Sequence, residues 1–290
     1  MINTLTLALL SDYGYQDAYT GILHAVALSR LTPQALQLTH RLDLTHGIPA
    51  FDIRAGAWSL LQTLPYLPAH AVCVAIVDPY VGDPNQRVAL VYRPSFQQVF
   101  LAPDNGLLNP LLGLIPEAQV FSLSQESLQS YGWYYPDSHQ SASAGKTFQG
   151  RDLYVPVACE ILNAWARQER PFFLNEAQAY ETTFKATSPF PALASREVEG
   201  FKAHLLLQDA FGNWITTLPS HWIPQKATQL NFVYQNEVKT LPIVSYFADM
   251  TIESEAFAIR GSHGFIEIAS FKSNSPLTLE RDGELCINFD

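Results

Sequence analysis

Long apolar runs in the first half of the chain each end abruptly at an aspartate followed by a glycine. Three runs share this pattern: TLALLSDYG ends at Asp12 and Gly14, VCVAIVDPYVG ends at Asp78 and Gly82, and QVFLAPDNG ends at Asp104 and Gly106. Such runs are typical of buried, largely parallel strands. Helical patterns lie at residues 17–30, 51–63 and 151–166. Strands that alternate with helices predict an N-terminal α/β domain.

The polar residues of this domain gather where its predicted strands end. In an open α/β sheet, ligands bind outside the carboxyl ends of the strands. Asp12, Asp78 and Asp104 all fall at such ends. The pattern therefore predicts a ligand site at this edge of the sheet.

The pattern changes near residue 183, where the stretch TTFKATSPFPALASREVEG carries prolines at 189 and 191 and has no clear period. Beyond it come short strand-like runs separated by turn residues, at 202–209, 229–235, 241–247, 256–261 and 265–270. Short strands between turns favour a small β-barrel or sandwich. We therefore predict an α/β domain over 1–183, a linker over 184–197 and an all-β, barrel-like domain over 198–290.

Composition narrows the classes of partner. The 290 residues are 48% hydrophobic and only 15% charged, which describes a compact globular protein. A net charge of -10 argues against nucleic acid, which needs a basic face, but is compatible with a small cationic ligand. No apolar run is long enough to span a membrane, and the N-terminal run is typical of a strand rather than a signal peptide. No nucleic-acid or membrane partner is therefore expected.

The cysteines indicate a compartment. Cys73, Cys159 and Cys286 are odd in number, far apart and flanked by apolar residues. This arrangement predicts reduced core residues and a cytoplasmic protein.

Several familiar chemistries are excluded by spacing. The stretch Gly145-Lys146-Thr147 resembles the end of a phosphate-binding loop, but position 140 is a glutamine where that motif needs glycine. The chain has no GxGxxG, HExxH, CxxC or GxSxG motif. Of the eight histidines, only His46 and His263 lie beside other candidate residues, so no metal site is expected.

Each remaining candidate also has a structural interpretation. Asp17 could cap the following helix, and Asp104-Asn105-Gly106 is a common turn sequence. The segment 43–46 could be a strand end with a satisfied histidine, and 209–213 a hairpin turn. Their joint occurrence at strand ends favours function instead.

Seven segments in order resemble the S-adenosylmethionine (SAM) hydroxide adenosyltransferases, whose relatives include fluorinase and chlorinase. Each similar pair is given with the family pattern first: TDFG..D.Y.G with SDYGYQDAYTG, DITH.I...D with DLTHGIPAFD, VVDPGVG with IVDPYVG, APDNG with APDNGLL, TFHGRD..AP.A with TFQGRDLYVPVA, D.FGN..TN with DAFGNWITT, and S.G.LEIA with SHGFIEIA. The resemblance runs from Leu10 to about Ser275. It implies an α/β domain followed by a β-barrel, and a homotrimer whose sites lie between one subunit's N-domain and its neighbour's C-domain.

The resemblance also implies ligand contacts to SAM or adenosine. Asp12 would bind the ribose diol, Asp17 the methionine ammonium and Asn213 the adenine edge. Phe51 and Phe211 would lie beside the ribose and the base, although either could be ordinary core. The APDNG match adds Asn105 to this set, and the last match adds Ser262 and His263 near the methionine end. His263 stands where the halogenating relatives carry arginine. SAM would be substrate or ligand, with no separate cofactor.

The residues that would handle the nucleophile depart from the family. Asp78 matches the family aspartate, and Arg87 matches the second arginine of a GT.RR pattern. The first arginine falls on Gln86 or Asn85, and the family histidine falls on Gln149. Glutamine cannot act as a base, but it can orient a water molecule. It could also merely brace the loop by bonding the backbone before the helix. Tyr80 adds bulk where the family loop has glycine.

These substitutions leave several functions open. The first is slow hydrolysis of SAM to adenosine and methionine, with water activated by Asp78 alone or with Arg87. A second is cleavage by another nucleophile such as a halide, although Asp78 would repel an anion and the halogenating relatives have tyrosine there. A third is non-catalytic binding of SAM or adenosine. A different nucleoside reaction also remains.

Overall fold

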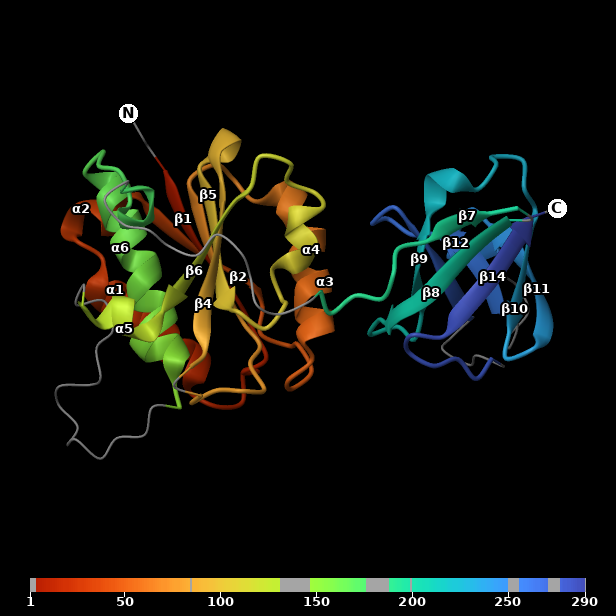
Figure 1. Cartoon of the computed structure of the whole chain (residues 1–290), viewed down its shortest axis with the longest axis horizontal. Helices are drawn as coiled ribbons and strands as arrows, with labels where there is room; N and C mark the ends of the chain where they lie inside the picture. The colour runs from red at the N-terminus through yellow and green to blue at the C-terminus, as the bar shows by residue number, and fades with distance from the viewer. Residues whose placement is uncertain are drawn as a thin grey trace. The chain divides into compact units, whose positions relative to one another are not determined.

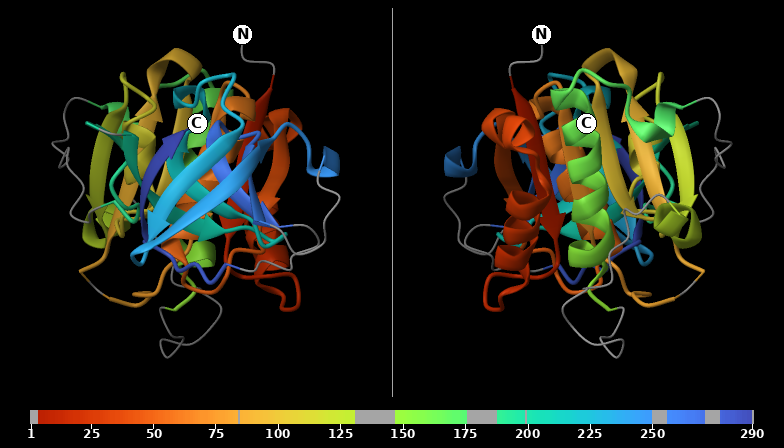
Figure 2. Two further views of the ribbon diagram at one scale, coloured as in Figure 1. Left: turned by 90° about the vertical axis from the view of Figure 1, so that its right-hand side faces the viewer. Right: turned by 90° about the vertical axis from the view of Figure 1, so that its left-hand side faces the viewer.

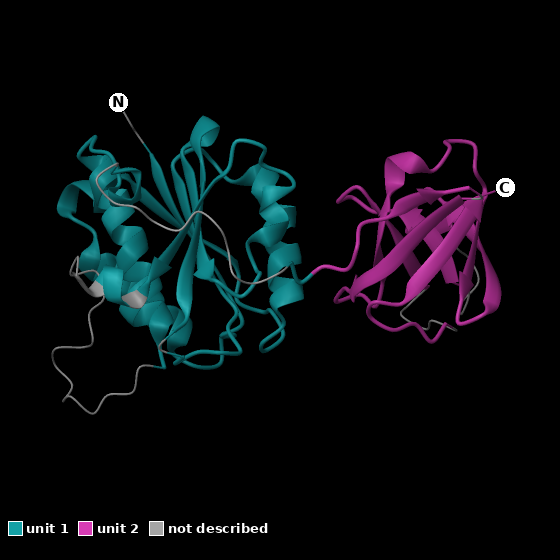
Figure 3. Ribbon diagram, viewed as in Figure 1, with its two compact units in different colours: residues 1–189 teal, residues 190–290 magenta. Residues whose placement is uncertain are grey.

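The computed structural model describes residues 4–83, 85–130, 147–175, 188–198, 200–249, 256–270 and 277–289. The chain divides into two compact units, Met1–Pro189 and Phe190–Asp290 (Figure 3). The boundary falls inside the predicted linker, and the last residues of that linker form a strand of the second unit.

The first unit is built on a six-stranded sheet in the order β2-β1-β3-β5-β4-β6 (Figure 1). Its strands are β1 (Leu5–Ser11), β2 (Thr39–Thr45), β3 (Ala71–Ile76), β4 (Arg87–Arg93), β5 (Gln98–Pro103) and β6 (Gln119–Ser124). The pairs β1–β2, β1–β3 and β3–β5 are parallel, whereas β4 runs antiparallel to β5 and β6. Every residue of β1, β3 and β5 is buried, which explains their continuous apolar runs. The predicted, largely parallel sheet is confirmed.

Helices cover both faces of this sheet. They are α1 (Tyr19–Arg30), α2 (Pro33–Leu38), α3 (Ile53–Thr63), α4 (Asn109–Leu112), α5 (Gln125–Ser130) and α6 (Val155–Ala166). Helices α1 and α6 pack side by side on one face, and α3 lies on the other (Figures 1 and 2). All but one residue of α6 is buried, because neighbouring helices and the sheet surround it. One five-residue turn, Gly150–Tyr154, is π-helical and leads directly into α6.

The second unit is a closed barrel. Its strands are β7 (Ser195–Glu197), β8 (Gly200–Gln208), β9 (Trp214–Pro219), β10 (Gln229–Tyr234), β11 (Glu237–Val244), β12 (Ala256–Arg260), β13 (Phe265–Ser270) and β14 (Glu284–Phe289). The order β14-β10-β11-β12-β13-β9-β8 closes through a β14–β8 pairing, and the short β7 adds to β8. Closure removes the exposed edges that an open sheet would leave. The barrel-like domain predicted from the turns is confirmed.

Two details of the sequence interpretation are wrong. Cys73 and Cys159 are buried, but Cys286 is exposed, because strict alternation along β14 turns every second side chain outward. Five strands were absent from the prediction, β4, β6, β7, β9 and β14, and β2 was foreseen only as a possible strand end at 43–46. Among the described residues, no helix has the length and apolar character needed to cross a membrane.

Candidate functional site

The carboxyl ends of β1, β3 and β5 meet at one edge of the sheet and bring three aspartates together. Ser11 pairs with Ile76 at the last rung of β1 and β3, and the Asp12 N–H donates to the Ile76 carbonyl over 3.3 Å. Asp78 follows β3 two residues later, and Asp104 follows β5 directly. The predicted convergence at this edge is therefore a property of the parallel register. We call these ends and the loops that follow them the carboxyl edge.

Asp12 is held by the loop that precedes α3. Its Oδ2 accepts the Phe51 N–H over 2.8 Å. Phe51 has a φ of 64°, a conformation that costs energy for a residue with a β-carbon. The residue is 62% exposed, so the interpretation of Phe51 as ordinary core is wrong. The strained backbone directs an N–H at the carboxylate and leaves the ring available at the surface.

Asp17 does not cap α1. The N-cap residue is Ala18, which makes no side-chain capping bond. Asp17 is exposed and hydrogen-bonds to no other residue that the structure describes. The loop is closed instead by the Thr20 hydroxyl, which donates to the Gly14 carbonyl over 2.9 Å. The capping interpretation is wrong, and the carboxylate is available to a ligand.

Asp78 is the most buried carboxylate of this edge, at 7% exposure. Its Oδ1 accepts the Tyr80 N–H over 3.0 Å, while the Tyr80 side chain itself is exposed. The Gln86 amide nitrogen lies 2.8 Å from both Asp78 oxygens and donates to them. Gln86 thus hydrogen-bonds the Asp78 carboxylate from a position where the family pattern has an arginine.

Arg87 contacts a different element. Its Nε donates to the Ser122 hydroxyl over 2.7 Å and its Nη2 to the Ser122 carbonyl over 2.6 Å, both on β6. The Ser122 hydroxyl in turn donates to Asp104 Oδ2 over 3.2 Å. Gln86, rather than Arg87, is therefore the residue that sets the position of Asp78.

Burial raises the pKa of Asp78 above its ordinary value. The Tyr80 N–H and the Gln86 amide oppose this rise, and the negative charge of Asp12 adds to it. A neutral amide stabilises a carboxylate less than a guanidinium does, since it carries no net charge. Asp78 is thus a well-oriented carboxylate that keeps a raised affinity for a proton.

Gln149 lies buried at the start of the π-helical turn, at 4% exposure. Its side chain makes no capping bond, and its Oε1 is buried without a hydrogen-bond partner in the described part of the chain. The interpretation of Gln149 as a brace for the backbone is therefore wrong. An unpaired buried amide oxygen costs free energy and is rare in folded proteins.

Two tyrosines that the sequence interpretation missed lie beside these groups. Burial, followed by the charges of Asp12 and Asp78, raises the pKa of Tyr13, whose hydroxyl hydrogen-bonds the Gly150 backbone. Tyr154 is fully buried, and its hydroxyl has no partner among the described residues. The sequence carried no signal for Tyr154, because the π-turn that relates it to Gln149 is visible only in the structure.

His46 and Asn105 have structural contacts at the same edge. His46 is fully buried, with Nδ1 2.7 Å from the Ser11 hydroxyl, and its Nε2 lies 3.2 Å from Asp43 Oδ1 without hydrogen-bond alignment. The Asn105 amide donates to the Val77 carbonyl over 2.8 Å, and its Oδ1 accepts the Leu107 N–H. Asn105 therefore ties the end of β3 to the loop after β5.

The candidates of the barrel unit fall on two hairpin turns. At the first, Asp209 Oδ1 accepts the backbone N–H groups of Phe211 and Asn213, and its Oδ2 accepts the Asn213 amide over 3.0 Å. The segment 209–213 is thus a turn, and Asn213 is 5% exposed. Phe211 is 76% exposed, so it is not ordinary core.

At the second turn, His263 Nε2 lies 2.9 Å from Glu267 Oε1, while Ser262 is exposed. A side chain at Gly261 would collide with both the His263 ring and Glu267. This glycine therefore permits the histidine–glutamate pair to form.

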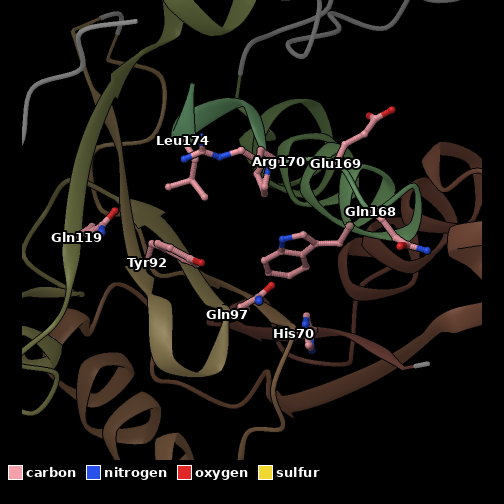
Figure 4. Close-up of a pocket in the computed structure, with 10 residues that line it drawn as sticks. His70, Tyr92, Gln97, Gln119, Gln168, Glu169, Arg170 and Leu174 are labelled. Atoms are coloured by element: carbon pink, nitrogen blue, oxygen red, sulfur yellow. The ribbon is translucent and has the colours of Figure 1, made fainter. Parts of the chain in front are cut away.

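A cavity of about 740 Å³ lies elsewhere in the first unit (Figure 4). Its lining includes His70, Gln97 and Gln119, which precede or begin β3, β5 and β6. Those positions mark the amino ends of these strands, opposite to the carboxyl edge. The cavity is thus separate from the aspartates, and its size does not make it the reaction site.

Comparisons with known proteins identify the family. The model of the SAM hydroxide adenosyltransferase N-terminal domain matches residues 7–169, and that of the C-terminal domain matches residues 203–280. The chain belongs to the SAM hydroxide adenosyltransferase family. The resemblance drawn from seven short motifs is thereby confirmed.

Relatives of this family member carry an activity in their names. A protein of Thermus thermophilus named (R)-S-adenosyl-L-methionine hydrolase is 31% identical over 264 residues, covering 90% of this chain and 89% of that protein. One of Salinispora arenicola with the same name is 36% identical over 217 residues, or 73% and 72% of the two chains. One of Methanocaldococcus jannaschii is 26% identical over 285 residues, or 95% and 92%.

Solved structures share the fold. A conserved protein of Thermotoga maritima superposes with a TM-score of 0.74 at 20% identity, covering 97% of this chain and 100% of that one. A conserved hypothetical protein of Thermus thermophilus gives a TM-score of 0.70 at 26% identity, covering 98% and 100%.

Proposed function

We propose that this protein hydrolyses SAM to adenosine and methionine, by in-line attack of water at C5′ of the ribose. The observation that carries the proposal is the buried carboxylate of Asp78, gripped on both oxygens by the neutral amide of Gln86. The relatives named SAM hydrolase support the same activity.

The chemistry requires a positioned water and a proton acceptor. The sulfonium of SAM makes C5′ electrophilic, and methionine leaves with the electron pair of the broken C–S bond. Water attacks from the opposite face, and its proton passes to Asp78. A base works best when its pKa lies near the working pH, so the raised pKa of Asp78 suits it to this role. Gln149 cannot accept the proton, and Arg87 is engaged with Ser122.

The buried charge of Asp78 also selects the nucleophile. A halide that entered beside an ionised, poorly hydrated carboxylate would be repelled, whereas water would be attracted by hydrogen bonding. Hydrolysis is therefore favoured over halide transfer at this site.

Substrate contacts divide between the two units. We assign the ribose diol to Asp12 and the methionine ammonium to Asp17, because both carboxylates are accessible and Asp17 has no competing contact among described residues. We assign adenine to Asn213 with Phe211, and the methionine end to Ser262 and His263. Asn105 braces the loop through its bonds to Val77 and Leu107, and its side chain also hydrogen-bonds Asp78, which lowers the pKa of that carboxyl.

These assignments place binding groups on both units, which motivates an assembly. We propose a homotrimer of about 97 kDa, three times 32.3 kDa, with each site formed between subunits. Light scattering checks this mass, and a stable monomer with full affinity for SAM contradicts it. We further propose a cytoplasmic location, in keeping with the free thiols of Cys73, Cys159 and Cys286.

The test of the function is product release. Purified protein is incubated with each sulfonium epimer of SAM, and adenosine and methionine are measured by chromatography. We expect equimolar release of both products, and we expect it to be slow because Gln149 replaces a histidine. Binding of intact SAM in calorimetry without any product would contradict the proposal and indicate a non-catalytic binder.

A further inference from the structure

The π-helical turn Gly150–Tyr154 changes which side chains share a face at the carboxyl edge. Its defining hydrogen bond joins the Val155 N–H to the Gly150 carbonyl, five residues earlier. Residues four or five apart share one side of a π-turn, as residues three or four apart do in an α-helix. Gln149 and Tyr154, which are five apart, are thereby brought to one side of the turn. Single π-turns of this kind are frequent at functional sites.

Both residues carry a buried polar atom that no described residue hydrogen-bonds. Gln149 is 4% exposed and Tyr154 is 1% exposed. The Gln149 Oε1 and the Tyr154 hydroxyl have no hydrogen-bond partner in the described residues. An unsatisfied hydroxyl in an apolar environment costs free energy, and a phenylalanine would fill the same space without that cost. Packing alone therefore gives no reason for the hydroxyl of Tyr154.

The turn that carries this hydroxyl lies against the carboxyl edge, because a β-carbon at Gly150 would come within 2.9 Å of the Tyr13 hydroxyl and 3.1 Å of Ile76 at the end of β3. The charges that act on Tyr154 come from Asp78 at the end of β3 and Asp104 at the end of β5, together with Tyr13 after β1. Burial, reinforced by these groups, raises the pKa of Tyr154, so the hydroxyl keeps its proton and remains a donor. A donor beside a buried carboxylate favours the charged form of that carboxylate.

We propose that the Tyr154 hydroxyl is a positioning residue of the hydrolytic site, where together with Gln149 it holds a water molecule against Asp78. The proposal rests on the function proposed above. A buried water needs two to four polar partners, and these three side chains supply a donor and several acceptors. Gln149 contributes its amide oxygen as an acceptor, and Tyr154 donates to the water oxygen. Gln149 can thus orient the water molecule, although it cannot act as a base as the family histidine would.

The electron pair and both water protons can be followed through the reaction. The water oxygen forms the new bond to C5′ as the C–S bond breaks, and the sulfur keeps that electron pair as the thioether of methionine. One water proton passes to Asp78 and later to solvent, and the other remains in the 5′-hydroxyl of adenosine. Tyr154 and Gln149 exchange no proton, so their contribution is orientation of the water before attack.

Replacement by phenylalanine tests the hydroxyl alone. Tyr154→Phe keeps the ring in the core, and Tyr92→Phe serves as the matched control, since Tyr92 lies on β4 and lines the separate cavity. We expect Tyr154→Phe to lower kcat about tenfold, the effect of one lost hydrogen bond, with KM unchanged. We also expect the acid side of the pH–rate profile to move to higher pH, because Asp78 loses indirect support for its charged form. Tyr92→Phe should change neither quantity.

The outcomes separate this inference from the proposed function. Unchanged kcat and pH profile in Tyr154→Phe, with a higher melting temperature, would overturn the inference and leave hydrolysis intact. If the wild type releases no adenosine, the proposed function fails instead. In that case, carbon-13 NMR of the Asp78 carboxyl decides the positioning role. An upward shift of the Asp78 pKa in Tyr154→Phe supports it, and an unchanged pKa contradicts it.

Discussion

The carboxyl edge of the α/β unit and the two turns of the barrel differ in how completely their polar side chains are paired. In the barrel, Asp209 binds Asn213 through both backbone and side chain, and His263 pairs with Glu267. At the carboxyl edge, Asp17 has no described partner, and the buried polar atoms of Gln149 and Tyr154 have none either.

The difference separates two tasks. A polar group satisfied by its neighbours is rigid, so the barrel turns can present atoms for recognition at fixed positions. A buried polar group left unsatisfied lowers stability, and such groups persist where they serve a substrate or a water molecule. We therefore propose that the chemistry takes place at the carboxyl edge, and that the barrel turns contribute only to recognition of the ligand.

The largest effect is expected from Asp78→Asn. If Asp78 takes the proton from water, its loss should lower kcat by roughly 10²–10⁴-fold, the usual contribution of a general base. In the wild type, the rate should fall as pH decreases through the Asp78 pKa, because only the carboxylate accepts a proton. Burial raises this pKa, so the fall should begin at a higher pH than for an ordinary aspartate. Adenosine release against pH measures both effects.

The matched control is Asp249→Asn. The exposed Asp249 of the barrel accepts the N–H groups of Ser245 and Tyr246, which an asparagine oxygen can still do. It should leave kcat unchanged. If the Asp78→Asn variant kept wild-type turnover, the reaction would not depend on the carboxyl edge. The contrast drawn between this edge and the barrel would then be wrong.

The second effect is a gain. Gln149→His restores a group that titrates near neutral pH, and combination with Gln86→Arg restores the charged partner of Asp78. We expect the double variant to release adenosine up to about 10²-fold faster than the wild type, the lower end of general acid–base contributions. Single-turnover assays of both single variants and the double variant measure it. Normal SAM binding with no gain in any variant would show that position 149 does not contact the nucleophile.

The third effect concerns affinity. Removal of the ribose acceptor by Asp12→Ala should weaken SAM binding by about 1.5–3 kcal/mol, the range for a hydrogen bond to a charged group. Because Asp12 also accepts the Phe51 N–H, Asp12→Asn is the sharper variant, since its amide oxygen can keep that bond. Calorimetry measures both. Equal affinity of wild type and Asp12→Asn, with weaker binding by Asp12→Ala, would make Asp12 a loop anchor rather than a ribose ligand.

The smallest effect on turnover is expected from a substitution in the barrel. Asp209→Asn keeps one acceptor oxygen of the 209–213 turn and loses the other, so the free energy of unfolding should fall by about 1 kcal/mol. Denaturant unfolding measures this change, and kcat should stay within twofold of the wild type. A large loss of kcat at unchanged stability would show that the barrel turn takes part in the chemistry.

The sequence was informative where the backbone pattern controls the outcome. Largely apolar strands, each followed by a loop with an aspartate and a glycine, predicted the parallel sheet and the common edge of Asp12, Asp78 and Asp104, because parallel register brings carboxyl ends together. Turn residues predicted the barrel. The strands β9 and β14 are as long as β3 and β5, but polar residues interrupt their apolar runs, so their strand signal was weaker.

The detailed contacts of the site could not be derived from the sequence. Whether Gln86 or Arg87 faces Asp78 depends on the course of one loop, and alternation along β4 sends Arg87 to Ser122. The π-turn inserts one residue into an otherwise regular helical pattern, so Tyr154 was indistinguishable from a core aromatic. Whether the Gln149 side chain hydrogen-bonds the backbone, as a brace would, can be seen only in the three-dimensional structure.

The most direct test of the central claim is SAM turnover in water enriched in oxygen-18, followed by mass spectrometry of the nucleoside product. Attack of water at C5′ predicts adenosine that carries one heavy oxygen at its 5′-hydroxyl, released together with methionine. Release should be lost in Asp78→Asn. Intact SAM after prolonged incubation, or a nucleoside without the heavy oxygen, would contradict the account.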